Sequence, residues 1–287
     1  MKLGIIGAEN SHTAAIAAML NIQKAIKGFS VTHVWGETDE FARKAAETGK
    51  IPNIVKEPSD MIGQVDCVMI DHRDGKNHLA PAEAFLKAGV PIFIDKPLST
   101  DLAKAKAFLS RCQRRGVPVT TMSAVPHQAC ITEIRKAIKE VGPVKAVHIN
   151  GPGDYRSPYG GIWFYGIHQV DLMVELLGAN PKTATLLASG DDSTAVVGYA
   201  DGVTVTMSFV KSGLKSFSLS LVGENGSSNH KIVMDGSPYL ATTKKFTFMF
   251  RTGREPFTRQ RMLAPLAVLE AMAKSLLEHK TVKVSPV

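Results

Sequence analysis

The first residues whose types and spacing could do chemistry follow a short apolar run at the start of the chain. A dinucleotide is held by a strand, a tight glycine turn and a helix N-terminus, usually written G-x-G-x-x-G. Here the three fingerprint positions hold Gly7, Glu9 and His12. A carboxylate about 4 Å from a phosphate oxygen repels it by about 4 kcal/mol at an effective dielectric constant of 20, so bound dinucleotide requires Glu9 to turn away. We expect Asn10 or Ser11 to cap the next helix, whose N-terminal amides attract an anion.

A second candidate is an acid that closes the second strand, which in dinucleotide sites holds the adenosine ribose about 20 residues or more after the glycine turn. Glu37, next to Gly36, is that candidate. The turn that follows contains no Arg or Lys, which favours NAD over NADP. Two alternatives stay open: Glu37 and Asp39 are solvated turn residues, or the fold is a doubly wound sheet that binds no dinucleotide.

A cation follows the strand predicted over residues 91–94. The sequence there reads Pro91-Ile-Phe-Ile-Asp95-Lys96-Pro97. An apolar strand that ends in Asp-Lys-Pro places Lys96 at the carboxyl edge of a parallel sheet, where such sheets bind ligands. The alternative is that Lys96 is a solvated strand end.

These residues need a scaffold, and the first part of the chain predicts one. Apolar runs at 2–6, 30–35, 65–70, 91–94 and 117–122 read as strands, and they alternate with helical patterns at 13–26, 40–48, 59–62, 78–88 and 100–115. Strands that alternate with helices predict a parallel, doubly wound sheet. We therefore expect a Rossmann-like dinucleotide-binding domain over residues 1–122.

The pattern changes near residue 123. Helices are predicted over 130–140, 163–177 and 265–279, and a strand near 144–149. Segments 203–209, 217–221 and 246–250 alternate apolar with polar residues, as half-exposed antiparallel strands do. Residues 123–287 are thus expected to form an α+β domain with an open, mostly antiparallel sheet.

Composition supports two folded domains. The 287 residues are about twice a typical domain of ~150, and 44% hydrophobic with 21% charged residues excludes disordered and collagen-like chains. The net charge is +8, and much of the surplus falls within residues 244–261, which we interpret as a solvated loop or a subunit contact. Because no basic helix carries interleaved aromatic residues, we expect no nucleic-acid partner.

Cysteine usage and hydropathy indicate the compartment. The three cysteines, Cys67, Cys112 and Cys130, are widely spaced and form no CxxC pair, which favours a reducing cytoplasm. The N-terminal apolar run is too short for a signal peptide, and no segment approaches about 18 apolar residues. We expect a cytoplasmic protein without a membrane partner.

Two signatures, in the right order, resemble those of the Gfo/Idh/MocA family, the relatives of glucose-fructose oxidoreductase and inositol dehydrogenase. The run from His78 to Ser99 resembles the (E/D)-K-P signature. Gly160-Gly-Ile-Trp-Phe-Tyr-Gly-Ile-His168-Gln-Val-Asp171 is similar to the second, a glycine followed by G-x-H-x-x-D. Residues 221–226 also resemble the family's late strand and turn, so the resemblance spans nearly the whole chain.

This resemblance implies a Rossmann domain that carries NAD or NADP, a second domain whose outer sheet face forms homo-oligomers, and oxidation of a sugar or polyol hydroxyl. It implies that Lys96 lies beside the nicotinamide and polarises the reacting oxygen, and that His168 takes the hydroxyl proton. The alternative for His168 is a hydrogen-bonded core histidine.

The chain departs from the family pattern beside His168. Many dehydrogenases of the family carry an Asp four residues before the His, and that position is Phe164 here. Asp171 lies on the same helical face and is a candidate to orient the imidazole, with Tyr165 as a second candidate. The alternative for Asp171 is helix capping or domain packing.

A second departure is the loop of residues 71–78, which is charged where the family usually has Thr-Pro and then a His. Only His78 matches, while Asp71 and His72 lie where the cofactor is expected to pass. Three interpretations of this loop stay open. It selects a different ligand, it binds a metal through Asp71, His72 and Asp74, or it is solvated surface. Because the ligands lack a helical i, i+4 spacing, we expect no metal site.

The loop with Tyr155 and Arg156 matches a family loop that lines the substrate cleft, where Arg156 would pair with a carboxylate or hydroxyls. A surface ion pair is the alternative. The sequence as a whole predicts an NAD(P)-dependent dehydrogenase or reductase of a sugar, polyol or related small molecule. The alternatives are an NAD-using lyase or hydrolase without net redox change, and a non-catalytic binding or sensing protein on the same fold.

Overall fold

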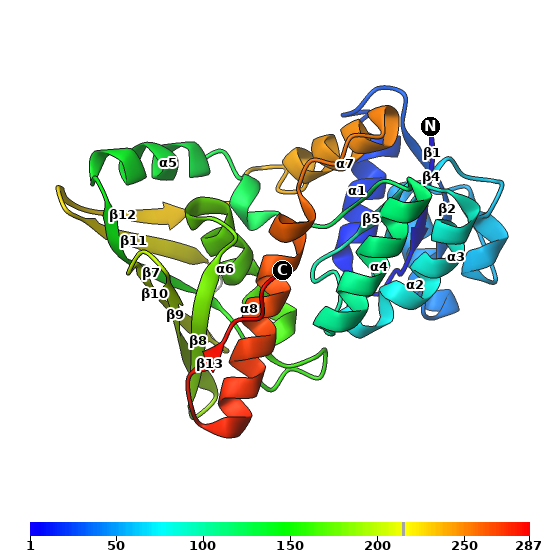
Figure 1. Ribbon diagram of the computed structural model, residues 1–287. Helices are drawn as coiled ribbons and strands as arrows, with labels where there is room; N and C mark the ends of the chain where they lie inside the picture. The colour runs from blue at the N-terminus through cyan, green and yellow to red at the C-terminus, as the bar shows by residue number, and fades with distance from the viewer. Residues whose placement is uncertain (214–215) are drawn as a thin grey trace. The chain divides into compact units, whose positions relative to one another are not determined.

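The structure is a computed structural model that describes residues 1–213 and 216–287 (Figure 1). The chain forms two compact units. The first contains Met1–Ser99, Ala103–Met122 and Tyr239–Thr258, and the second contains Thr100–Leu102, Ser123–Pro238 and Arg259–Val287.

The first unit is built on a six-stranded sheet in the order β3-β2-β1-β4-β5-β6. All of its strand pairs are parallel. The order reverses between β1 and β4, which is the point where Rossmann sheets bind their ligands. The predicted doubly wound parallel sheet is therefore confirmed. Its strands are β1 (Lys2–Ile6), β2 (Ser30–Trp35), β3 (Asn53–Ile54), β4 (Cys67–Ile70), β5 (Ile92–Ile94) and β6 (Val119–Thr120).

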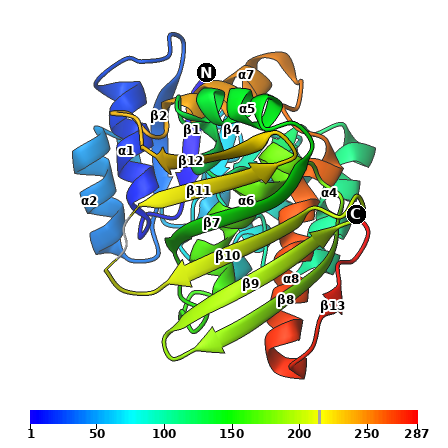
Figure 2. The ribbon, with the colours of Figure 1, turned by 90° about the vertical axis from the view of Figure 1, so that its left-hand side faces the viewer.

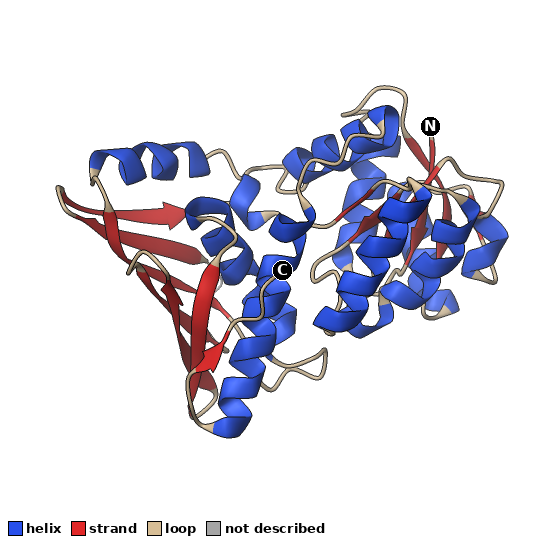
Figure 3. Ribbon diagram, in the orientation of Figure 1, coloured by secondary structure: helices blue, strands red, loops and turns tan. Residues whose placement is uncertain are grey.

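Helices connect these strands, as Figure 3 shows in blue. They are α1 (Ser11–Asn21), α2 (Asp39–Gly49), α3 (Leu79–Ala88) and α4 (Leu102–Arg115), with short 3-10 helices η1 (Pro58–Met61) and η2 (Gly75–Asn77). Local chemistry sets their ends: the Thr38 hydroxyl accepts the Phe41 N–H at the start of α2, and Gly89 takes a left-handed conformation at the end of α3.

One segment differs from its sequence prediction. Residues 246–250 were expected to be an antiparallel strand, but they lie in helix α7 (Leu240–Thr252). Phe246, Met249 and Phe250 are buried at helical spacing, and Phe246 stacks on Phe93 of β5 with ring centroids 4.4 Å apart. The five-residue alternation was too short to separate the two periods. Helix α7 therefore packs in the core of the first unit, although the predicted domain division placed it in the second.

The second unit is built on a seven-stranded sheet in the order β12-β11-β7-β10-β9-β8-β13. Only the β7–β10 pair is parallel, so the sheet is mixed and mostly antiparallel, as expected. Figure 2 shows one face of this sheet, with α6 and α8 behind it. Its strands are β7 (Val144–Pro152), β8 (Pro181–Ser189), β9 (Asp192–Tyr199), β10 (Thr204–Val210), β11 (Phe217–Gly223), β12 (Gly226–Ile232) and β13 (Val282–Lys283).

The helices of the second unit are η3 (Val125–His127), α5 (Ile131–Glu140), α6 (Ile162–Leu177) and α8 (Arg259–Glu278). Helix α8 packs along β8, and α6 packs against β7 and β10. Among the described residues, no helix is long and apolar enough to cross a membrane.

Candidate functional site

The carboxyl edge of the first sheet gathers most of the predicted cofactor residues. Gly7 follows β1, and its φ of +107° belongs to the region that favours glycine. A Cβ on Gly7 would lie 2.6 Å from the backbone of Asp71, the residue that follows β4. Only glycine therefore allows the first turn and the loop after β4 to pass this close.

Glu37 lies just after β2 and is folded onto the glycine loop. Its Oε2 accepts the N–H groups of Ala8 and Glu9 at 2.8 and 2.9 Å, and its Oε1 is 2.9 Å from Nδ1 of His72. Burial raises the pKa of Glu37, but the bonds from His72 and from the backbone amides outweigh it and lower the pKa to about 2. Glu37 is thus an ionised side chain at the position where the ribose is expected.

The glycine loop and the charged loop after β4 pair with each other. Besides the Glu37–His72 pair, Nη1 of Arg73 lies 3.6 Å from Oε1 of Glu9. The Glu9 carboxylate, which the sequence places at a phosphate-binding position, is therefore partly neutralised by a residue of the loop that departs from the family pattern. The charges of Glu9 and Arg73, two departures from the family pattern, thus compensate each other.

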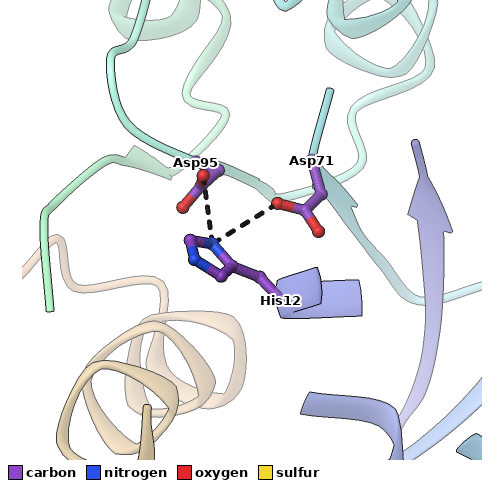
Figure 4. A group of neighbouring side chains, drawn as sticks. All are labelled: His12, Asp71 and Asp95. Atoms are coloured by element: carbon purple, nitrogen blue, oxygen red, sulfur yellow. Dashed lines mark ion pairs between the residues drawn. The ribbon is translucent and has the colours of Figure 1, made fainter. Parts of the chain in front are cut away.

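A third set of contacts joins the same two loops to β5. His12 of α1 lies between the carboxylates that follow β4 and β5 (Figure 4): its Nδ1 is 3.2 Å from Oδ2 of Asp95 and 3.8 Å from Oδ1 of Asp71. The amide of Asn10 donates to both carboxylates. Asn10 occupies the N-cap position of α1, but its side chain makes no capping bond.

The two aspartates differ in charge environment. Burial and the neighbouring charge of Asp95 raise the pKa of Asp71 well above its usual value. Burial also raises the pKa of Asp95, but the charges of Lys96 and His12 outweigh it and lower that pKa. Lys96, only 8% exposed, lies 3.3 Å from Oδ2 of Asp95, so it is not a solvated strand end.

His78 holds the two adjoining loops together. Its Nδ1 is 2.6 Å from the carbonyl oxygen of Pro97, and its Nε2 is 2.8 Å from that of His72. The residue is fully buried, and burial lowers its pKa. The one position of this loop that matches the family therefore joins the backbone of its own loop to that of Pro97, the residue after Lys96.

These residues fit a dinucleotide. The side chain of Asn10 does not cap the first turn of α1, so the N-terminal amides of this helix are directed toward an anion such as a diphosphate. Glu37 is ionised at the ribose position, and buried Lys96 follows β5. Two carboxylates, Asp71 and Asp95, lie at the same edge and add negative charge.

The second unit holds His168 on α6. Nδ1 of His168 is 2.7 Å from Oγ of Ser123, and that oxygen also accepts the N–H of Val125 at 3.1 Å. Asp171 is 3% exposed, and its Oδ2 accepts the N–H of Ser123 at 2.8 Å. Asp171 therefore acts on the imidazole through Ser123.

Arg261 of α8 anchors this chain of contacts. Its Nη1 donates to Oδ1 of Asp171 at 2.6 Å, and its Nη2 lies 3.0 Å from Oε2 of Glu175. Arg261 falls in the basic segment that we interpreted as a solvated loop or subunit contact, yet only 14% of its side chain is exposed. Sequence reasoning missed Ser123 and Arg261 because neither belongs to a signature.

Tyr155 and Arg156 have their hydrogen-bond and ion-pair partners on another turn. The Tyr155 hydroxyl donates to the carbonyl of Gly190 at 2.7 Å, and Arg156 pairs with exposed Asp191 at 3.6 Å. Both therefore pack on the turn between β8 and β9, as the surface alternative predicts. Tyr165 is 41% exposed and meets His168 through a ring contact, with centroids 5.9 Å apart.

Comparisons with known proteins agree with this geometry. A family model described as "Oxidoreductase family, NAD-binding Rossmann fold" matches residues 1–123. The chain is similar to an uncharacterized protein of Saccharomyces cerevisiae (26% identity, 47% of this chain and 45% of that protein). It is also similar to a D-apiose dehydrogenase of Paraburkholderia graminis (24% identity, 64% of this chain and 55% of that protein). The matches thus span about half the length of these curated relatives.

The fold extends the likeness to the second unit. The structure resembles a myo-inositol dehydrogenase from Lactobacillus casei, solved in complex with NAD(H) and myo-inositol, with a TM-score of 0.85, 17% identity, and coverage of 100% of this chain and 97% of that one. The match to the family of oxidoreductases with an NAD-binding Rossmann fold thus covers residues 1–123, and the likeness to the solved dehydrogenase shows the same fold over the whole chain.

Proposed function

We propose that this protein is an NAD-dependent dehydrogenase or reductase that acts on a hydroxyl or carbonyl group of a sugar, polyol or related small molecule. The observation that carries the proposal is Lys96, buried at the carboxyl end of β5 and paired with Asp95. A buried cation at this edge serves to polarise an oxygen of a bound ligand.

The nicotinamide ring, when bound, accepts or returns a hydride. In the first unit, the N-terminal amides of α1 bind the diphosphate, Glu37 binds the ribose hydroxyls, and Lys96 polarises the reacting oxygen. In the second unit, His168 takes the hydroxyl proton as general base. When Nδ1 of His168 carries its proton and donates it to Oγ of Ser123, Nε2 is the basic nitrogen.

Cofactor binding is the first test. The melting temperature is measured with NAD, NADH, NADP and NADPH, because a ligand at about 100 times its dissociation constant adds about 2.7 kcal/mol to the free energy of unfolding. We expect a rise with NAD or NADH. No shift with any of the four nucleotides would overturn the proposal.

Turnover is the second test, with a panel of sugars, polyols and their keto forms as substrates. Lys96→Ala and His168→Ala are expected to abolish it, while His230→Ala, on β12 and hydrogen-bonded to Ser228, is the control. Activity retained in either site variant contradicts the roles assigned to these residues.

The clustered carboxylates favour a second candidate, a non-catalytic binding or sensing protein. Asp71 and Asp95 lie within hydrogen-bond reach of one amide, that of Asn10, and Phe164 replaces the usual acid. A nucleotide that binds without turnover of any substrate in the panel would favour this candidate. A further alternative is an NAD-using lyase or hydrolase that oxidises its substrate transiently. Such an enzyme would convert its substrate to a different product without net formation of NADH.

We further propose a cytoplasmic homo-oligomer assembled through the outer face of the second sheet, where Val196 of β9 is 37% exposed. Val196→Lys is expected to lower the sedimentation coefficient, and Ile54→Lys on the first unit is the control. A monomeric wild type contradicts this assembly. Cell fractionation tests the compartment.

A further inference from the structure

The strongest unassigned feature is the cluster of His12, Asp71 and Asp95 (Figure 4). One potential ligand atom from each, an imidazole nitrogen and two carboxylate oxygens, lies within 4.8 Å of the others. Two ligands bound side by side to one cation at about 2.0–2.2 Å are about 3.0–3.6 Å apart. The measured separations of 3.2 and 3.8 Å from Nδ1 of His12 require little movement to reach this geometry.

Charge is the second argument. Asp71 is fully buried, and across residues 1–213 and 216–287 no lysine or arginine lies within ion-pair distance of it. The nearby Lys96 pairs with Asp95 instead. Buried carboxylates are usually paired with a charge or bound to a metal, and a bound cation would give Asp71 such a partner.

The position of Asn10 marks the centre of the cluster. Its amide nitrogen is 3.0 Å from Oδ1 of Asp71, 3.3 Å from Oδ2 of Asp95 and 3.3 Å from Nδ1 of His12. An amide nitrogen has two hydrogens, one for each carboxylate oxygen, while Nδ1 of His12 faces both the amide and Asp95. A single positively charged centre would satisfy all three, and the rotated amide would offer its oxygen as a further ligand.

The sequence supplies an independent argument. His12 stands at the third glycine position of the dinucleotide fingerprint, and Asp71 stands in the loop that is neutral in the family pattern. These two departures are far apart in the sequence, yet they meet beside Asp95 of the Asp-Lys-Pro signature. The fold brings these three positions to one edge of the sheet, and in this chain all three hold side chains that can bind a metal.

We propose that His12, Asp71 and Asp95 bind a divalent transition-metal cation, Zn²⁺ or Mn²⁺, at the carboxyl edge of the first sheet. One imidazole with two carboxylates suits these ions, whereas Ca²⁺ takes six to eight oxygen ligands and Mg²⁺ keeps several waters. The site goes beyond the proposed function. It also places positive charge near the N-terminus of α1, where two carboxylates would otherwise oppose a diphosphate.

The test titrates Zn²⁺ into the chelator-treated full chain by calorimetry, and Mn²⁺ by the loss of its free-ion paramagnetic resonance signal. The variants are His12→Asn and Asp71→Asn. Their controls are His33→Asn on β2 and Asp66→Asn, which precedes β4 where Asp71 follows it. We expect one equivalent of bound metal, affinity at least tenfold weaker in both site variants, and unchanged affinity in the controls.

Absence of saturable binding, or equal affinity in the wild type and His12→Asn, would overturn the proposal. The His12 side chain is 15% exposed, so its replacement decides the test if Asp71→Asn does not fold, as judged by circular dichroism. Nucleotide binding is measured separately. Metal binding without nucleotide binding would contradict the proposed oxidoreductase activity but not the cation site. Nucleotide binding without metal binding would contradict the cation site but not the oxidoreductase activity.

Discussion

Glu37 connects the loops at this edge of the sheet without any bound ligand. It closes the turn after β1 by accepting the amides of Ala8 and Glu9, and it holds the next loop through His72. A ribose bound here shares a carboxylate that the protein already uses. Because these bonds favour the ionised carboxylate, the stability that Glu37 contributes depends on pH.

Glu37→Gln tests this role through pH. The folded pKa of about 2 lies below the reference value of 4.5, so ionised Glu37 stabilises the protein above pH 4.5 and loses that contribution as the pH falls toward 2. We therefore expect the difference in free energy of unfolding between wild type and variant to be largest near pH 7 and to shrink over this range, as measured by urea denaturation. Exposed Glu47→Gln on α2 is the control. A difference that is independent of pH contradicts the assignment.

The Glu9–Arg73 pair gives a second prediction at this scale. Arg73→Gln is expected to weaken nucleotide binding about two- to fivefold, because it leaves the Glu9 carboxylate uncompensated near the diphosphate; partly exposed pairs are worth up to about 1 kcal/mol. The double variant Glu9→Gln with Arg73→Gln should recover the affinity. Dissociation constants from fluorescence titration provide the measurement, and an Arg73→Gln variant equal to wild type would contradict it.

At the scale of elements, α6 and α8 position His168 through the segment that enters the second unit. Ser123 joins the imidazole to Asp171, and Arg261 joins Asp171 to Glu175. Position 164 holds Phe, and the imidazole of His168 instead contacts the hydroxyl of Ser123, whose backbone N–H donates to Asp171.

Ser123→Ala is expected to lower kcat about tenfold or more with little change in KM, because the imidazole loses its orienting partner while substrate contacts remain. Ser123→Thr retains the hydroxyl and should restore most of the rate. Steady-state kinetics on a substrate identified with the proposed panel provide the measurement. An unchanged kcat in Ser123→Ala would show that Ser123 does not position His168.

Arg261→Gln tests the anchor by stability. Breaking a buried ion pair typically costs about 3–5 kcal/mol because the partner charge is left unpaired, and the Asp171 side chain is only 4% exposed. Arg135 also pairs with Glu175 but is 48% exposed, so Arg135→Gln should cost less than about 1 kcal/mol. Urea denaturation measures both; equal losses would contradict the buried role of Arg261.

At the scale of the whole molecule, a segment that follows the second sheet in the sequence completes the first unit. Helix α7 follows the last strand of the second sheet, yet its aromatic face belongs to the core beneath β1, β2 and β5. A fragment that ends at residue 122 lacks this face, so the Rossmann half depends on residues near 250.

Phe246→Ala measures that dependence. Phe246 is fully buried, and truncation of a buried Phe costs about 3–5 kcal/mol. Phe248, two residues along the same helix, is 50% exposed, so Phe248→Ala is expected to cost less than about 1 kcal/mol. The free energy of unfolding, followed by Trp35 fluorescence with Trp163 replaced by Phe, distinguishes them. Comparable losses would show that α7 does not complete this core.

Most strands of the first sheet, three strands of the second (β7, β10 and β11), most helices and the two signature segments could be predicted from the sequence, because apolar periodicity, glycine turns and the Asp-Lys-Pro strand end are local signals. Strands β3, β8, β9, β12 and β13 were not predicted. Helix α7 could not, since a five-residue alternation fits both periods and its partner, Phe93, is far away in the chain. Tyr155 and Arg156 were selected by position in a family loop, but their partners lie on a turn that no local pattern reveals.

By itself, the sequence determined the parallel sheet, the family resemblance and the residues that depart from it, since these follow from residue types and short spacings. Only the tertiary structure decided what the departures do. Arg73 meets Glu9, His72 meets Glu37, and His12 meets two aspartates because parallel strands bring their carboxyl ends to one edge, whatever their separation along the chain. Charged residues that replace parts of a binding motif in the sequence therefore contact one another in the structure.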